Sequence, residues 1–261
     1  MIKLIVSDVD GTLVEDGSPA LNPELFDVIL QLRKKGIQVV IASGRPWISV
    51  ENTFASVKEK IFYVSNNGAY VGCYGRCLYA YPIEEHMVKR LIEKVRLYPD
   101  LEIVYAGING DYVETEDEEL CGWLVDSYKF HLNRVEDLME VKEPCVKISI
   151  YKRQGIEAAT REIYEEFNGA LKMACAGDMW MDCMAKGVNK GHAVRTIQES
   201  LGISPQETMA FGDQLNDIEM LERAYYSFAV ANAREEVRRA ARFQADSNVN
   251  DGVLKILKQL L

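Results

Sequence analysis

The sequence predicts an α/β protein whose parallel-sheet core is interrupted by a smaller α+β domain. Two observations carry this prediction. Short apolar runs alternate with amphipathic segments over residues 1–81 and again over 187–261, a pattern typical of strands joined by helical crossovers. Residues 82–186 instead mix helices with strands suited to an antiparallel sheet. We therefore expect one core built from both parts of the chain, with an inserted domain at 82–186.

Strand and helix signals alternate in order along the first part. Apolar runs rich in β-branched residues predict buried strands, and apolar residues three and four apart predict helices. Gly36 is expected to end the first helix, and Pro46 to begin the second. The predicted elements are strand Ile2–Ser7, helix Asn22–Lys35, strand Ile37–Ala42, a helix from Pro46, strand Phe62–Ser65 and the hairpin Ala69–Tyr79.

The insert begins with a strongly amphipathic helix and continues with short strands. Val146–Tyr151 alternates between apolar and polar residues, as a half-exposed strand does. The predicted helices are Glu84–Leu97, Glu116–Asp126 and Ile156–Phe167, and the predicted strands are Leu101–Tyr105, Tyr112–Thr115, Val146–Tyr151, Leu171–Ala174 and Met179–Met184.

After the insert the alternation of strands and helices returns. The predicted elements are helix His192–Leu201, strand Thr208–Phe211, helix Ile218–Arg223, strand Tyr226–Ala231, helix Glu235–Ala241 and helix Val253–Leu260.

Composition narrows the class of partner. The 261 residues contain 30 Lys and Arg against 40 Asp and Glu, a net charge of -10. This negative charge argues against nucleic acid and anionic membranes as binding partners, because both bind to Lys and Arg side chains. It permits a small phosphorylated metabolite bound by a local cluster of residues. The six cysteines form no C-x-x-C pair, and we interpret them as small buried hydrophobic residues in a reducing compartment.

The expected location is the cytoplasm. No apolar run reaches the length of a membrane span. The apolar run at the start is interrupted by Lys3, Asp8 and Asp10, which does not fit a signal peptide. The sequence does not indicate an oligomeric state.

The strongest local signal is Asp8-Val9-Asp10-Gly11-Thr12, which directly follows the first predicted strand. Open α/β sheets bind their ligands at the carboxyl ends of strands. Two carboxylates placed there would repel each other unless a cation or a proton compensated them. An ordinary acidic turn is the alternative.

A second acidic motif, Gly212-Asp213-Gln214-Leu215-Asn216-Asp217, follows the predicted strand at 208–211. Together with Asp8 and Asp10, the carboxylates of Asp213 and Asp217 would form an oxygen-rich site that favours Mg²⁺ over zinc. Taken alone, this segment could be an acidic cap for the helix that follows.

A phosphate-binding role is predicted for two further segments. Ser43, followed by Gly44 and Arg45, lies between a strand and a helix N-terminus, where free N–H groups favour an anion. Lys190 opens another helix and could balance the carboxylates. The alternatives are an N-cap serine and a solvated lysine.

Four weaker candidates have structural explanations of equal or greater weight. Asn67 could belong to a turn, and Asn232 could cap the helix at 235. Trp180 and Asp182 could face a cleft, but core packing and a solvated edge are favoured.

Taken together, these motifs resemble those of the haloacid dehalogenase superfamily. Its four motifs occur in order as Asp8-Val9-Asp10-Gly11-Thr12, Ser43, Lys190, and Gly212-Asp213 with Asn216-Asp217. The large insert and the segments Ala229-Val230-Ala231-Asn232-Ala233 and Asn250-Asp251-Gly252-Val253 resemble the Cof-type phosphatases with a type IIB cap. Val9, where leucine is more usual, is a small departure. The resemblance implies a Rossmann-like core and a cap that selects substrates.

The resemblance also implies roles for the motif residues. Asp8 would be the nucleophile and Asp10 the general acid and base. Mg²⁺ would be bound by the Asp8 carboxylate, the Asp10 main-chain carbonyl and the Asp213 carboxylate, with Asp217 in support. The residues implied to bind the phosphoryl group or substrate are Ser43, Gly44, Arg45, Lys190 and Asn216.

The sequence thus predicts a Mg²⁺-dependent phosphatase acting on small metabolites, such as sugar phosphates or phosphorylated cofactors of the FMN or pyridoxal phosphate kind. A phosphomutase of the same superfamily is the first alternative. A non-catalytic binding or regulatory protein is the second, and the paired Asp8 and Asp10 argue against it, since an idle site has no need of two costly carboxylates.

Overall fold

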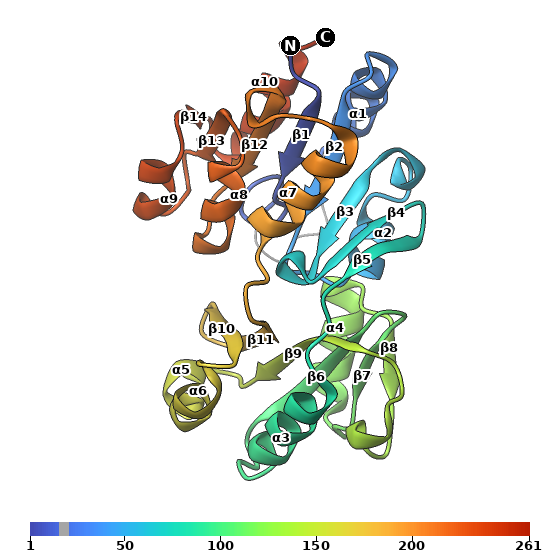
Figure 1. Cartoon of the computed structure of the whole chain (residues 1–261), viewed down its shortest axis with the longest axis vertical. Coiled ribbons are helices and arrows are strands. Elements are labelled where there is room, and N and C mark those ends of the chain that lie inside the picture. The colour runs from blue at the N-terminus through green and yellow to red at the C-terminus, as the bar shows by residue number, and fades with distance from the viewer. Residues whose placement is uncertain (16–20) are drawn as a thin grey trace. The chain divides into compact units, whose positions relative to one another are not determined.

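The computed structural model describes residues 1–15 and 21–261, which divide into two compact units (Figure 1). The first unit comprises residues 1–79, 127–129 and 189–261 apart from the undescribed segment, and the second comprises 80–126 and 130–188.

A mostly parallel sheet forms the centre of the first unit. In the described residues its strand order is β14-β13-β12-β1-β2-β3-β4-β5, so strands from the two ends of the chain share one sheet. The parallel strands are β1 (Leu4–Ser7), β2 (Gln38–Ala42), β3 (Phe62–Ser65), β12 (Thr208–Gly212), β13 (Tyr226–Val230) and β14 (Phe243–Ala245). The hairpin strands β4 (Tyr70–Cys73) and β5 (Arg76–Ala80) extend one edge, with β4 antiparallel to β3.

Helices connect these strands. The first buries Leu25, Val28, Ile29 and Leu32 on one face and carries acidic residues in its first turn and basic residues in its last, as the helix dipole favours. The helices of this unit are α1 (Glu24–Lys34), α2 (Trp47–Thr53), α7 (Lys190–Leu201), α8 (Ile218–Glu222), α9 (Glu235–Ala240) and α10 (Gly252–Lys258).

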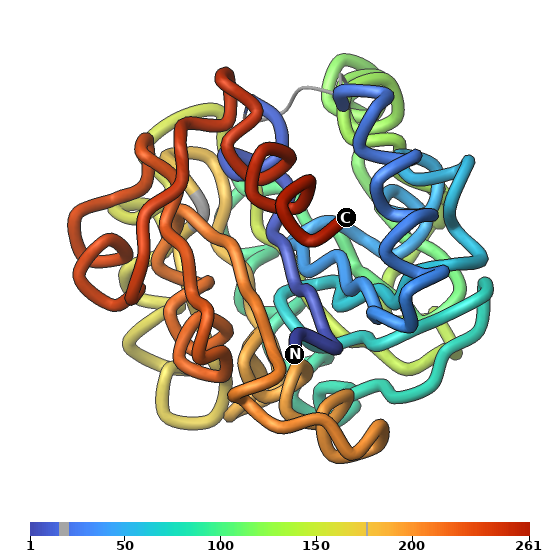
Figure 2. The backbone as a smooth tube through the Cα atoms, turned by 90° about the horizontal axis from the view of Figure 1, so that it is seen from above, coloured from blue at the N-terminus to red at the C-terminus, as the bar shows by residue number. Residues whose placement is uncertain are grey.

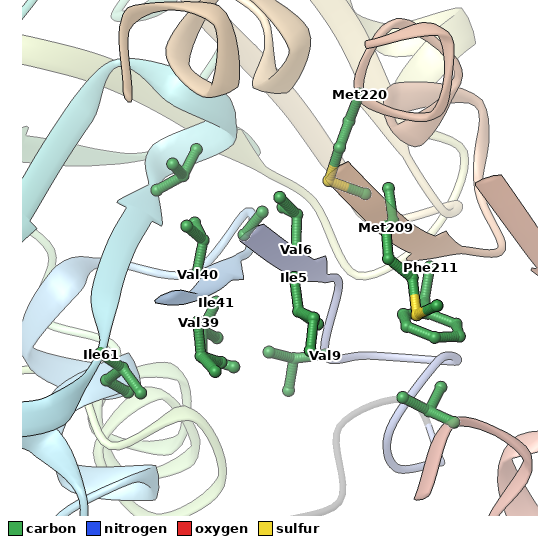
Figure 3. Close-up of a cluster of buried hydrophobic side chains, with 14 of the residues drawn as sticks. Ile5, Val6, Val9, Val39, Val40, Ile41, Ile61, Met209, Phe211 and Met220 are labelled. Carbon is green, nitrogen blue, oxygen red and sulfur yellow. The ribbon is translucent and has the colours of Figure 1, made fainter. Parts of the chain in front are cut away.

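Apolar side chains on both faces of the sheet hold this unit together. Ile5 and Val39 point to one face, and Val6 and Val40 point to the other (Figure 3). All four are almost fully buried, which explains the near-continuous apolar strand sequences. Burying side chains of this size stabilises the fold by about 1.5–3 kcal/mol each.

The strand order brings the carboxyl ends of distant segments together. β1 pairs in parallel with β12 on one side and with β2 on the other. Figure 2 shows the corresponding blue and orange segments side by side. The loops that follow these three strands therefore emerge at one edge of the sheet.

The second unit is an α+β domain. Its six-stranded sheet has the order β10-β11-β9-β6-β7-β8, antiparallel except between β7 and β8. One face packs in an apolar cluster with α3 and α6, which includes Leu91, Ile148 and Ile163. The strands are β6 (Glu102–Gly107), β7 (Asp111–Val113), β8 (Leu132–Arg134), β9 (Cys145–Tyr151), β10 (Leu171–Ala176) and β11 (Trp180–Ala185), and the helices are α3 (Glu85–Val95), α4 (Glu118–Tyr128), α5 (Ile156–Ala159) and α6 (Arg161–Phe167).

The predicted fold class is confirmed, while some local predictions are wrong. β9 is buried along its whole length instead of half-exposed, and Asp182 on β11 bonds to its polar residues Lys147 and Ser149. The single helix predicted over 156–167 is divided at Thr160. Strands β8 and β14, of three residues each, were not predicted. Cys77 and Cys175 are exposed, whereas the other four free cysteines are buried as expected.

Within the described part of the chain, no helix combines the length and the apolar character needed to cross a membrane.

Candidate active site

Three of the predicted motifs emerge from adjacent strands of the first unit. Asp8 follows β1, Ser43 follows β2, and Asp213 follows β12. The fourth, Lys190, is the first residue of α7. Its position is fixed by Asn189, whose side chain accepts a hydrogen bond from the His192 N–H at 2.7 Å and so caps the helix.

Asp8, Asp213 and Asp217 form a compact acidic cluster. One carboxylate oxygen from each lies within 4.8 Å of the others, and all three residues are buried. Oxygen donors at this spacing are suited to a hard divalent cation. The structure therefore brings together three of the four residues predicted to bind metal. The fourth, Asp10, follows Asp8 by two residues, and its carboxylate pairs with Arg45.

Lys190 is the positive partner of this cluster. Its Nζ lies 2.6 Å from Asp8 Oδ1 and 2.7 Å from Asp217 Oδ1, and the residue is only 1% exposed. The alternative of a solvated lysine is therefore excluded, and Lys190 balances the carboxylates as predicted. Burial alone would lower the pKa of Lys190, but the Asp217 and Asp8 carboxylates outweigh burial and raise that pKa.

The three carboxylates remain electrostatically crowded despite the lysine. Burial, followed by the charge of Asp217, raises the pKa of Asp8 well above its usual range. The same two causes raise the pKa of Asp213 to about 6. One ammonium facing three carboxylates leaves two negative charges unbalanced, which is the charge that a divalent cation would neutralise.

Backbone and hydroxyl donors fix the second acidic loop. Asp217 Oδ2 accepts the N–H groups of Asp213 at 2.9 Å and Gln214 at 3.0 Å. Thr12 donates its hydroxyl to Asp213 Oδ1 at 2.8 Å, which ties the first motif to this loop. Gly11 has φ +83°, and a Cβ there would overlap the Asp213 carboxylate. Only glycine allows the two loops to approach this closely.

Asp10 lies in a different environment from Asp8. Arg45 donates Nε to Asp10 Oδ2 at 2.8 Å and Nη2 to Asp10 Oδ1 at 2.5 Å, a two-pronged ion pair. The Arg45 side chain is 4% exposed and that of Asp10 is 22% exposed. The sequence predicted Arg45 as a substrate-binding residue, whereas these two donors are directed at Asp10.

Ser43 is fully buried at the end of β2. Its Oγ accepts the Arg45 N–H at 3.1 Å, and among the described residues no group accepts the hydroxyl proton. The hydroxyl proton is therefore left to donate to a ligand. Gly44 follows it, and a Cβ at that position would lie 3.2 Å from Asn67 Oδ1, so the amide of Asn67 packs directly against this loop.

Two asparagines of the sequence analysis contact the motif loops. Asn216 donates Nδ2 to Asn67 Oδ1 at 2.9 Å. Asn232 donates Nδ2 to the Gly11 carbonyl at 2.7 Å and accepts the Asn248 N–H, so it ties the first motif to the C-terminal segment. It does not cap α9, whose N-cap residue is Arg234. The sequence did not predict these contacts, because a single asparagine in a turn does not indicate which distant residues it bonds.

Trp180 and Asp182 lie in the second unit, and Asp182 is not on a solvated edge. It is buried, with Lys147 Nζ at 3.3 Å and the Ser149 hydroxyl at 2.6 Å from its carboxylate. Trp180 stacks on Trp123 and contacts Tyr151. The buried ion pair was missed because Lys147 and Asp182 are 35 residues apart in the chain.

The first unit can therefore position a nucleophile, a second carboxylate and donors for an anion. Asp8 has one oxygen bound to Lys190, and among the described residues no hydrogen bond reaches the other. Ser43, Lys190 and Asn216 supply hydrogen-bond donors, and the acidic cluster fits Mg²⁺ by its all-oxygen donors and its charge.

The chain is similar to known proteins along almost its whole length. The family model for haloacid dehalogenase-like hydrolases matches residues 5–257. A 5-amino-6-(5-phospho-D-ribitylamino)uracil phosphatase of Escherichia coli is 27% identical, and the match covers 100% of this chain and 96% of that protein. A crystal structure from Eubacterium rectale has a TM-score of 0.91 with 36% identity, covering 100% of this chain and 99% of that one.

The fold is also shared with a subclass IIB sugar phosphatase of the haloacid dehalogenase superfamily. The TM-score is 0.83 with 24% identity, and the match covers 99% of this chain and 98% of the other. The match to the family model over residues 5–257 confirms the resemblance read from the four motifs.

Proposed function

Since the chain belongs to the haloacid dehalogenase-like hydrolases and is a phosphatase of that family, we propose that it is a Mg²⁺-dependent enzyme acting on small phosphorylated metabolites through an aspartyl-phosphate intermediate. The observation that carries this proposal is the buried Asp8 carboxylate, which Lys190 holds by one oxygen. A carboxylate fixed in this way can act as a nucleophile toward phosphorus.

In the proposed first step, the other oxygen of Asp8 forms a bond to phosphorus as the ester P–O bond breaks. Asp10 gives a proton to the departing alkoxide. In the second step, water attacks the phosphorus of the aspartyl-phosphate and Asp10 takes a proton from that water. The bond between phosphorus and the Asp8 oxygen breaks, which releases inorganic phosphate and restores the Asp8 carboxylate. The Arg45 ion pair holds Asp10 in place for both transfers.

The remaining motif residues would bind the transferring phosphoryl group. The Ser43 hydroxyl and the Asn216 amide are hydrogen-bond donors, and Lys190 is a charged one. A phosphoryl group in transfer spreads its negative charge over its oxygens, so donors placed around it lower the barrier. We include Gly44 in this set because its N–H lies beside Ser43 in the same loop.

Asp8, Asp213 and the Asp10 main-chain carbonyl would hold Mg²⁺, with Asp217 in support. When bound, the ion would neutralise the unbalanced carboxylate charge and polarise the phosphoryl oxygens. Both Asp217 oxygens already accept hydrogen bonds, which is why we assign it a supporting role.

We propose that residues 82–186 form the domain that selects the substrate. The sheet of the second unit has one apolar face and buries Lys147, Ser149 and Asp182 on β9 and β11. The substrates we propose for it have a polar, hydroxyl-bearing leaving group, as in sugar phosphates or phosphorylated cofactors. The relative from Escherichia coli is named for such a substrate. The proposal retains the cytoplasmic location expected from the sequence.

The decisive variant is Asp8→Asn, which keeps the shape of the side chain and removes the nucleophile. We expect turnover of a generic aryl phosphate with Mg²⁺ to fall by at least 1000-fold, in the range for loss of a covalent catalyst. Asp27→Asn, on the exposed side of α1, is the matched control and should retain full activity. An Asp8→Asn protein with wild-type activity would refute the mechanism.

The same assay separates the phosphatase from the phosphomutase alternative. A phosphatase releases inorganic phosphate without any bisphosphate activator, whereas a mutase returns the phosphoryl group to the substrate. A panel of phosphorylated metabolites, assayed with Mg²⁺ and again with a chelator, would then rank the substrates.

A further inference from the structure

The turn that follows β3 has an unusual backbone. Asn66, Asn67 and Gly68 have φ values of 48°, 56° and 100°, so three consecutive residues are left-handed and two of them are not glycine. Such conformations are strained for residues with a side chain and persist only where the surroundings hold them. The turn is also buried, since all three residues have little exposure.

This turn touches three of the four motif segments. The Asn67 N–H donates to the Ser43 carbonyl at 3.1 Å, and the Asn66 N–H donates to the Arg45 carbonyl at 3.0 Å. At Gly68, a Cβ would overlap the carbonyl oxygen of Asn189, the residue that caps α7 and precedes Lys190. The turn therefore lies between the serine loop and the N-terminus of the helix that carries the lysine.

The side chain of Asn67 makes the third connection. Its Oδ1 accepts a hydrogen bond from Asn216 Nδ2 at 2.9 Å, and it packs against Gly44. One N–H of the Asn216 amide is thus directed at Asn67, and the same bond fixes the direction of the second N–H. Without this acceptor the Asn216 side chain, which is partly exposed, would be free to rotate.

We propose that Asn67 is a positioning residue for the phosphoryl group: its amide orients Asn216 while its backbone holds Ser43. The proposal rests on the proposed phosphatase function. In it, Asn67 acts through two neighbours that contact phosphate, and the strained turn is the means by which one residue reaches both loops.

The alternative is that Asn67 is only a turn former, chosen because asparagine tolerates a positive φ. Asn67→Gly distinguishes the two. Glycine adopts this backbone with less strain, so a turn-forming role predicts that the variant is at least as stable and fully active. A positioning role predicts retained stability but lower activity, because the bond that orients Asn216 is lost.

We expect Asn67→Gly to lower kcat/KM for a generic aryl phosphate by roughly two- to tenfold. We also expect it to raise the inhibition constant of inorganic phosphate, with the melting temperature unchanged or higher. Loss of one neutral hydrogen bond corresponds to a change of roughly two- to tenfold. Tyr74→Gly is the matched control, because Tyr74 also has a positive φ, 55°, but is exposed in the turn between β4 and β5. It should leave both constants unchanged.

A double-mutant cycle with Asn216→Ala tests the route. If Asn67 acts through Asn216, adding Asn67→Gly to Asn216→Ala should cost less than twofold further. Equal losses in both backgrounds, or full activity of Asn67→Gly alone, would overturn the proposal. A wild-type protein without phosphatase activity would instead refute the proposed function, so the two failures are distinguishable.

Discussion

Lys190→Met would test whether the site is held together by charge. Methionine keeps most of the length of the side chain but removes the ammonium that contacts Asp8 and Asp217. Removing one partner of a buried ion pair typically costs about 3–5 kcal/mol, because the remaining charge is left uncompensated. Lys190 has two such partners and is 1% exposed, so we expect a loss in the upper part of this range.

The assay is urea unfolding of the full chain with a chelator and again with saturating Mg²⁺. A ligand present at about 100 times its dissociation constant stabilises the folded state by about 2.7 kcal/mol. We expect Mg²⁺ to raise the free energy of unfolding more in Lys190→Met than in the wild type, since the variant has one more unbalanced charge at the metal site. The variant should remain inactive in both conditions.

The matched control is Lys258→Met on α10. Lys258 lies 2.6 Å from Glu24, but both side chains are about half exposed, so the loss should be at most about 1 kcal/mol. If Lys190→Met were as stable as Lys258→Met with the chelator present, the reasoning from buried charge would be refuted.

Two further predictions concern the second unit. Burial raises the pKa of Asp111 to about 7, opposed by Lys147 and reinforced by Glu143, from 3.8 in the unfolded chain. The free energy of unfolding of the wild type should therefore fall as the pH rises from about 4 to 7, at up to about 1.4 kcal/mol per pH unit. Asp111→Asn should flatten this slope in urea melts, and equal slopes in the two proteins would contradict the prediction. Lys147→Met should lower the free energy of unfolding by about 3–5 kcal/mol, because it leaves the buried Asp182 carboxylate without its cation; a variant as stable as the wild type in urea melts would contradict this prediction.

The sequence alone predicted that the motif residues lie close together, because the carboxyl ends of parallel strands mark where an α/β sheet binds its ligands. Asp8, Ser43 and Asp213 each follow an apolar run, and parallel neighbouring strands end at the same edge of a sheet. Lys190 could be placed only at a helix start, and whether it was solvated depended on the three-dimensional neighbours. The spacing of residues in the sequence therefore could not predict that Lys190 is buried between two carboxylates.

Side-chain pairing across strands explains most of what the sequence did not predict. The alternation of Lys147 and Ser149 with apolar residues indicates that one face of β9 is exposed to solvent. In the structure both residues are buried and bond to Asp182. Arg45 follows the serine of a phosphate-binding loop, but its guanidinium is directed at Asp10. In each case the partner side chain belongs to a different strand or loop, and a single sequence does not show which distant residues pair in the fold.

The contrast between Asp8 and Asp10 gives a physical reason for their proposed division of roles. A nucleophile gains reactivity when it loses water, and Asp8 is buried with one oxygen fixed by Lys190. A general acid and base must instead exchange protons with a leaving group and with water, and the Asp10 side chain retains 22% exposure. Each carboxylate has its own cation, and the two cations come from different elements, α7 and the loop after β2. Two aspartates separated by one residue can therefore have different environments, and exchanging the two cation partners would remove the distinction on which the proposed mechanism depends.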